Sequence, residues 1–341
     1  MSIKPNRAAG CGRHRIVAAR RRFTNALAAL AVLAAPMAPT IAAEWPERPV
    51  RVVVPFAPGG NVDIVARIVA QGLGDALGQP IVVENKPGAN AAIGAETVAH
   101  APPDGYTLLF GTAETHALNP HLRKRLPYDP TKDFASIGIV DRFPFSLVVS
   151  PGLGVETLPA FVTLAKARDG AFNFASWGNG STSQIAFEQL KQSTGMKLEH
   201  VPFKGAAPAI TAVAAGDVQA FVVPLSVARP QAASQRVRLL AVLSAAREPA
   251  APDLPTATEQ GVPVVIDGWH VLAAPRATPA PIVARINQAL NATLSQAAVR
   301  ERLAQAGVTP VGGSAEQADA TVRAEFARWG DVARKAGIEP N

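Results

Sequence analysis

The 341-residue sequence has one cysteine, two tyrosines and three methionines, and only 17% of its residues are charged. The cysteine, Cys11, precedes a short apolar run, so the chain beyond that run has no thiol for a disulfide or a lipid anchor. Hydrophobic residues make up 48% of the chain, which excludes wholesale disorder and supplies a large core. The length predicts two domains or one large domain.

Acidic residues are absent from positions 1–43, which hold seven of the 33 basic residues. Removing that segment leaves 26 basic and 26 acidic residues in the remaining 298. A neutral body lacks the clustered positive charge that binds phosphate backbones. We therefore expect no nucleic-acid partner, although the net charge of the whole chain is +7.

Residues 1–43 have the three parts of a signal peptide. A basic region ends at Arg22, an apolar region covers 26–35, and small residues follow at 41–43. The apolar region is shorter than the ~20 residues that span a bilayer, which argues against an uncleaved anchor. We expect cleavage after Ala43 and a periplasmic protein. The Arg20-Arg21-Arg22-Phe23 sequence fits twin-arginine export, but Tat and Sec both remain open.

From Pro49 onward, short β-type runs alternate with helical segments, the pattern of an α/β fold with doubly wound sheets. The first set predicts strands at 50–55, 81–84 and 106–110, with helices at 62–77 and 91–100. The second set predicts strands at 146–150, 172–175, 198–202, 218–223 and 238–242, with helices at 157–167, 182–193 and 206–214. The segment 279–337 reads as almost purely helical, and we expect it to cover the first sheet.

This order predicts two lobes joined by a hinge, with a ligand between them. Lobe 1 takes residues 44–144 and 269–341, and lobe 2 takes residues 145–268. The chain is expected to cross between the lobes near 143–147 and near 268–273.

Two glycine-rich loops lie between a predicted strand and a predicted helix. Gly59 and Gly60 allow a ligand to approach the backbone closely, and the helix that follows offers free N–H groups to an anion. The alternative is a tight turn in which Asn61 caps the helix and Asp63 faces its dipole. The segment 176–183 repeats the arrangement in lobe 2, so the pair predicts a carboxylate site. A third loop, 111–115, could join its wall.

Motifs for catalysis are missing from the chain. It has no nucleophile elbow, no Walker A motif and no complete dinucleotide fingerprint. His116 and His121 are interpreted as loop histidines, so no metal is expected. Because no cofactor motif is present, no cofactor is expected either. A hydrolase that uses Ser181 or Ser183 as nucleophile remains the rival hypothesis, although the sequence offers no obvious base.

Many blocks of the chain, in order, resemble the Bug-type periplasmic solute-binding proteins, the receptors of tripartite tricarboxylate transporters. The first blocks are Trp45-Pro46, Val54–Gly60 with Asp63, Val83–Ala89, Pro103–Leu109, Leu126–Pro130 with Lys132–Phe134, and His200–Gly205. The later ones are Pro255-Thr256, Glu259, Gly261, Trp269, Ala274-Pro275 and Thr278-Pro279.

The resemblance implies a type II-like Venus flytrap that closes on a small organic carboxylate and passes it to a membrane permease or a sensor. It also implies a monomer that is not an enzyme. The ligand contacts that it implies are Phe56, Ala57, Gly59, Gly60, Asp63, Gly111, Thr112, Ser176, Trp177, Gly178, Asn179, Gly180, Ser181, Ser183, Lys204, Gly205 and Ala206. Trp177 departs from the small residue that is common at its position. It could stack on an aromatic carboxylate with Phe56, or simply pack under its loop.

Overall fold

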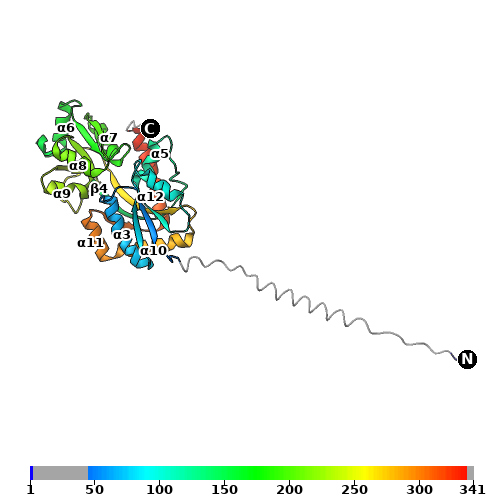
Figure 1. Ribbon diagram of the computed structural model, residues 1–341. Helices are drawn as coiled ribbons and strands as arrows, with labels where there is room; N and C mark the ends of the chain where they lie inside the picture. The colour runs from blue at the N-terminus through cyan, green and yellow to red at the C-terminus, as the bar shows by residue number, and fades with distance from the viewer. Residues whose placement is uncertain (3–44, 336–341) are drawn as a thin grey trace. The chain divides into compact units, whose positions relative to one another are not determined.

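The computed structural model describes residues 1–2 and 45–335 (Figure 1). The predicted signal peptide therefore lies almost wholly outside the described residues. The described residues from Pro46 onward form one compact unit, and the fold is that of this unit. Among the described helices, none is long and apolar enough to cross a membrane.

The first sheet has the strand order β2-β1-β3-β9-β4-β10. Its centre is the valine-rich β1, which is parallel to β2 and β3, as its continuous apolar run predicts. β9 is antiparallel to both β3 and β4, so the sheet is mixed. The bounds are β1 Val50–Val54, β2 Ile81–Asn85, β3 Thr107–Thr112, β4 Phe134–Val149, β9 Asp267–Pro275 and β10 Thr309–Gly312.

The second sheet has the order β8-β4-β7-β5-β6. β7 is parallel to β5 and antiparallel to β4, so this sheet is mixed as well. The bounds are β5 Asn173–Ser176, β6 Glu199–Pro202, β7 Ala220–Pro224 and β8 Arg238–Val242.

Helices follow the strands as the apolar spacing predicts, and several end at a glycine, such as Gly195 and Gly216. The 17-residue α3 stops at Gly78, whose φ of 73° is left-handed and suits glycine. α10 packs on α3 and β4, and α12 packs on β4. The bounds are α3 Asn61–Leu77, α4 Ala92–Ala99, η2 Glu114–Leu118, α5 Asn119–Leu122, η3 Pro151–Leu153, α6 Leu158–Ala167, α7 Thr182–Thr194, α8 Ala206–Ala215, α9 Leu225–Ala233, α10 Ala280–Ser295, α11 Ala297–Gln305 and α12 Ala315–Lys335.

The 16-residue β4 belongs to both sheets. Up to Pro144 it pairs with β9, and from Phe145 onward it pairs with β7 and β8. The chain returns between Ile266 and Asp267, because Ile266 donates its N–H to the carbonyl of Leu243, the residue after β8, while Asp267 begins β9. The predicted crossing at 268–273 therefore falls inside β9. We call residues 46–144 and 267–335 the first lobe, and residues 145–266 the second lobe.

Several elements differ from the prediction. The strand expected at 146–150 begins at Phe134, the stretch 267–275 is a strand, and β10 interrupts the segment expected to be helical. The loop interpretation of His116 and His121 is wrong, because these residues lie in η2 and α5. α9 was also not expected. Each of these elements depends on contacts with segments far along the chain, and local spacing does not report those contacts.

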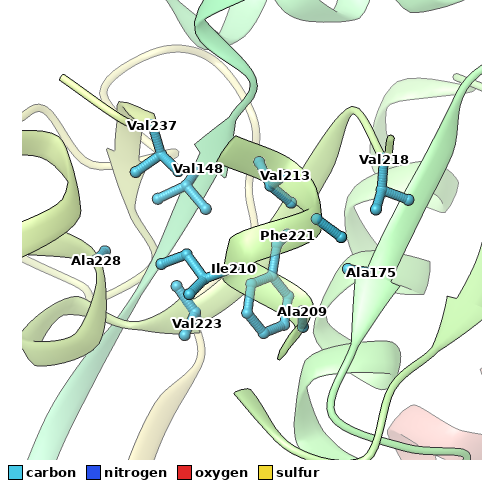
Figure 2. Close-up of a cluster of buried hydrophobic side chains, with 11 residues drawn as sticks. Val148, Ala175, Ala209, Ile210, Val213, Val218, Phe221, Val223, Ala228 and Val237 are labelled. Atoms are coloured by element: carbon cyan, nitrogen blue, oxygen red, sulfur yellow. The ribbon is translucent and has the colours of Figure 1, made fainter. Parts of the chain in front are cut away.

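A buried cluster joins α8 and α9 to the second sheet, as Figure 2 shows. Its members are small or branched, except Phe221, which lies among them on β7. Trp177 and Phe203 pack at its margin from the loops that follow β5 and β6. The cluster therefore anchors the loops that follow β5 and β6 to the second sheet. Its members are Val148, Ala175, Ala209, Ile210, Ala212, Val213, Val218, Phe221, Val223, Ala228 and Val237.

Gly268 makes room for an aromatic ring beside the crossing. It lies opposite Phe143 in the ladder of β4 and β9, and a β-carbon at Gly268 would overlap the Phe143 ring. Phe143 in turn stacks on His270, with ring centroids 4.8 Å apart. The absence of a side chain at this position is therefore a packing requirement.

We expect Gly268→Ala to lower the free energy of unfolding by about 1–3 kcal/mol, because the added methyl group displaces a buried ring. Urea titration followed by circular dichroism measures this change. Gly152→Ala is the matched control, since the atom nearest its β-carbon is 3.9 Å away. Equal effects of the two substitutions would contradict the packing role of Gly268.

Candidate functional site

The first glycine-rich loop runs from β1 into α3 and is held by Asp63. This carboxylate accepts hydrogen bonds from the Gly59 N–H (2.9 Å), from Asn85 Nδ2 (2.9 Å) and from Arg67 Nε (3.1 Å). Burial acts to raise the pKa of Asp63, but hydrogen bonds from Arg67, Gly59 and Asn85 outweigh it and hold the pKa below its usual value. Asp63 thus holds the first glycine-rich loop to the start of α3, and Arg67 is its counter-ion.

The start of α3 differs from the tight-turn alternative. Gly60, rather than Asn61, is the N-cap residue, and no side chain caps the helix. Asn61 instead donates from Nδ2 to Ser226 Oγ at 2.9 Å, across the junction of the two lobes. The first N–H groups of α3 are therefore left without a side-chain acceptor, beside the exposed residues Ala57 and Gly59.

The three serines of the second-lobe loop are buried, and their hydroxyl groups serve the loop itself. Ser181 Oγ donates to the Gly178 carbonyl, and Ser183 Oγ donates to the Val222 carbonyl, both at 2.6 Å. Neither hydroxyl contacts a base. Ser176 Oγ lies 2.6 Å from His200 Nε2 and accepts the Gly178 N–H at 3.1 Å.

Trp177 is partly buried and packs on two rings of the second lobe. It stacks on Phe145 with centroids 5.9 Å apart and meets Phe221 edge-on at 6.1 Å. The Phe145 ring in turn contacts the Phe143 ring edge-on, with centroids 5.4 Å apart. The Trp177 indole is therefore anchored by packing on its inner side, while part of its surface stays exposed.

The third loop begins inside the first sheet. Gly111 is buried, and a β-carbon there would overlap the His116 ring, so this glycine serves core packing. Thr112 is buried too and donates from Oγ1 to Glu114 Oε2 at 2.8 Å. Glu114 Oε1 accepts from the hydroxyl and the N–H of Thr182, at 2.7 and 3.2 Å. The start of α7 is thus occupied by a carboxylate of the chain.

The loop that follows β6 leads into α8. Its Lys204 is exposed, and Gly205 is the N-cap residue with a φ of 114°. No side chain caps α8, so the second lobe also has a helix start whose donors lack a side-chain acceptor.

Burial divides the seventeen predicted contacts into two groups. Exposed or partly exposed are Phe56, Ala57, Gly59, Gly60, Trp177, Gly178, Asn179, Gly180, Lys204, Gly205 and Ala206. Buried and engaged within the protein are Asp63, Gly111, Thr112, Ser176, Ser181 and Ser183. The first group can meet a ligand directly, whereas the second group shapes the loops.

Three residues at these loops were missed in the sequence, namely Asn90, Ser226 and His200, whereas Glu114 lies in the third loop that was expected to join the site wall. Asn90 and Glu114 reach across the lobe junction to Gly180 and Thr182, and Ser226 meets Asn61 in the same way. Only three-dimensional closure brings these partners together. The position of His200 could be predicted in part, because it lies on β6, which runs parallel to β5, the strand that ends at Ser176.

A separate pocket of about 420 Å³ lies at the far end of α3, between that helix and β2. Its lining includes Gln71, Gly74 and Ile81, about 20 Å along the helix from Gly60. It has no group suited to chemistry beyond one carboxylate, Asp75, so we assign no site there. Within the part of the chain that the structure describes, no three His, Cys, Asp or Glu side chains gather as metal ligands.

His200 makes the second-lobe loop sensitive to acid. Burial, with the positive charge of Lys191, lowers the pKa of His200 to about 4. An unfolded histidine has a pKa of about 6.5, so between these values the unfolded chain binds a proton that the folded protein does not. The stability that neutral His200 contributes is present above pH 6.5 and is lost as the pH falls toward 4.

We expect His200→Gln, which can keep a hydrogen bond to Ser176, to flatten the pH dependence of stability. One such histidine gives a slope of up to about 1.4 kcal/mol per pH unit. Urea titrations of the wild type and the variant at pH 7, 6 and 5 measure the difference. An unchanged slope in the variant would show that His200 is not held neutral by the fold.

Comparison with known proteins agrees with this architecture. Residues 65–338 match the model of the tripartite tricarboxylate transporter family receptor. Protein BugT of Bordetella pertussis is 34% identical over 304 residues, covering 89% of this chain and 93% of BugT.

Two solved structures from Rhodopseudomonas palustris share the fold, and each is 36% identical to this chain. Rpa4515 with adipate has a TM-score of 0.84, covering 87% of this chain and all of that one. MatC with bound malate has a TM-score of 0.78, covering 84% and 99%. The two-lobed solute-binding fold expected from the sequence is therefore confirmed, and the chain belongs to the receptor family of the tripartite tricarboxylate transporters.

Proposed function

We propose that this protein is a periplasmic receptor that binds a small organic carboxylate between its lobes and delivers it to the membrane permease of a tripartite tricarboxylate transporter. Family membership supports the receptor role. The related proteins of known structure hold adipate and malate, which are both dicarboxylates. A sensor protein is the alternative recipient, and we propose that the receptor acts as a monomer.

The observation that carries this proposal is the pair of uncapped helix starts at glycines. α3 begins after Gly60 in the first lobe, and α8 begins after Gly205 in the second. Main-chain N–H groups at a helix start attract an anion through hydrogen bonding and the helix dipole. A dicarboxylate has two anionic groups, so one could bind at each lobe and thereby draw the lobes together.

Cations contribute little to this arrangement. Arg67 is bound to Asp63 and also donates from Nη2 to Asn85 Oδ1 at 3.0 Å, so its charge is neutralised beside the first loop. Lys204 is the exposed cation among the predicted contacts. Carboxylate binding should therefore depend only weakly on salt, and Lys204→Gln should change affinity only slightly.

A binding role also fits the serines better than catalysis does. Ser181 and Ser183 are buried and donate to main-chain carbonyls, so the rival hydrolase would have neither a free nucleophile nor a base beside it. We propose that the protein is not an enzyme. The exposed side of Trp177, opposite its packed side, leaves room for an aromatic carboxylate among the ligands to be tested.

We expect adipate or malate to raise the midpoint of thermal unfolding of the full chain, because a ligand that binds only the folded state stabilises it. A concentration 100 times the dissociation constant adds about 2.7 kcal/mol. Differential scanning fluorimetry with adipate, malate, citrate and benzoate compares the classes, with hexanediol as the uncharged control. If no carboxylate shifts the midpoint, the proposed function is wrong.

A second variant tests the uncapped start of α3 directly. Gly60 has φ −81° and ψ 170°, which any residue adopts, and the nearest atom to its β-carbon is 3.8 Å away. Asp is a favoured N-cap residue, so Gly60→Asp should cap α3 with its own carboxylate and leave the unliganded stability intact. We expect a loss of at least about tenfold in carboxylate affinity by calorimetry, through competition for the same N–H groups.

Gly60→Ala is the matched control, because it adds a β-carbon without an acceptor. We expect its affinity to stay closer to that of the wild type. Unchanged affinity in Gly60→Asp would place the anion elsewhere.

A further inference from the structure

One carboxylate lies buried at the lobe junction without a basic partner among its hydrogen-bond donors. Glu114, on η2 of the first lobe, is 4% exposed. Its Oε1 accepts from the hydroxyl of Thr182 at 2.7 Å and from the N–H at 3.2 Å, and Thr182 is the first residue of α7 in the second lobe. Its charge is therefore held by dipoles, including the positive end of α7, that belong largely to the opposite lobe.

A strained turn makes a second contact at the same place. Ala89, Asn90 and Ala91 have φ values of 50°, 50° and 71°, in the left-handed region that residues other than glycine rarely adopt. Asn90 Nδ2 donates across the junction to the Gly180 carbonyl at 2.8 Å. Backbone strain of this kind persists only where the surroundings enforce it.

The surroundings that enforce the turn are visible. Asn119 donates from Nδ2 to the Asn90 carbonyl at 2.8 Å, and its Oδ1 accepts from Asn90 Nδ2 at 3.1 Å. Arg123 Nη2 donates to the Ala89 carbonyl at 2.7 Å. These hydrogen bonds hold the backbone of the turn in the conformation from which the Asn90 side chain donates to Gly180.

Both contacts must break when the lobes separate about their two crossings. Opening would leave Glu114 without the two donors of Thr182 and Asn90 without Gly180. The second lobe would also lose the anion at the start of α7. On the other side of the junction, Asn61 and Ser226 make one neutral hydrogen bond.

We propose that Glu114 and Asn90 form a latch that holds the lobes together before any ligand binds. The carboxylate of Glu114 takes the place of a ligand anion at the start of α7, so closure is favoured without ligand. If the protein is the carboxylate receptor proposed above, a ligand enters only after this latch opens, and the latch then limits the association rate. The latch itself concerns the unliganded protein and can be tested without any ligand.

The test is an interlobe distance distribution in the unliganded full chain. Spin labels at Ala160 on α6 and Ala284 on α10, both exposed, report one lobe each. Cys11→Ser removes the only native cysteine, so labelling is specific. Electron double resonance should give a dominant short-distance population and a minor longer-distance population in the wild type. Glu114→Ala should raise the share of the longer-distance population about tenfold, as expected for losing a charge-assisted contact.

Asn90→Gly is the second variant, because glycine keeps the left-handed backbone and removes the side-chain amide that donates to Gly180 across the junction and to Asn119 within the first lobe. We expect it to open the lobes as well, so the proposal stays testable if Glu114→Ala folds poorly. Thr112→Val is the matched control, since it removes a hydrogen bond to the same carboxylate within the first lobe only.

Longer distances in Glu114→Ala and Asn90→Gly, with unchanged distances in Thr112→Val, would establish the latch. Wild-type distances in both latch variants would overturn it, as would a wild type that is already open. None of these readings uses a ligand, so failure of the latch leaves the carboxylate proposal standing, and failure of carboxylate binding leaves the latch standing.

Discussion

β4 is shared by both sheets, and this sharing constrains the whole structure. Its first part pairs with β9 and β10, its last part with β7 and β8, and the exchange takes one step between Pro144 and Phe145. A row of rings follows the same path from Trp177 through Phe145 and Phe143 to His270. β4 is therefore part of the sheet of each lobe. We expect the lobes to move relative to each other only by rotation about the two points where the chain crosses between them.

Buried carboxylates of this protein position loops and receive few lysine or arginine contacts. Asp63 fixes the first loop and neutralises Arg67, while Glu114 crosses to the start of α7. The hydroxyl groups of Ser181 and Ser183 in the second-lobe loop likewise donate to main-chain carbonyls. What stays accessible is backbone at Gly60 and Gly205, which suits recognition of a carboxylate shape through N–H donors rather than through ion pairing.

Most helices and the parallel strands could be predicted from the sequence, because their apolar spacing is local. The shared strand and β9 could not, since each contains residues that are unusual in strands and that find their partners in the other. Asp141 and His270 face each other fully buried, 2.9 Å apart, and Gly268 accommodates Phe143. The candidate site shows the same division: the two loops at 56–63 and 176–183 could be predicted from glycines that precede a helix, whereas the contacts of Asn90 with Gly180 and of Glu114 with Thr182 join residues far apart in the sequence.

The central claim is that uncharged main-chain donors from both lobes hold a carboxylate. A crystal structure of the protein with a carboxylate identified by thermal shift tests it most directly. We expect ligand oxygens within hydrogen-bond distance of N–H groups at the starts of α3 and α8, directly or through one water, with Arg67 still bound to Asp63. A carboxylate paired with Arg67 or Lys204, or bound outside the lobe junction, would contradict it.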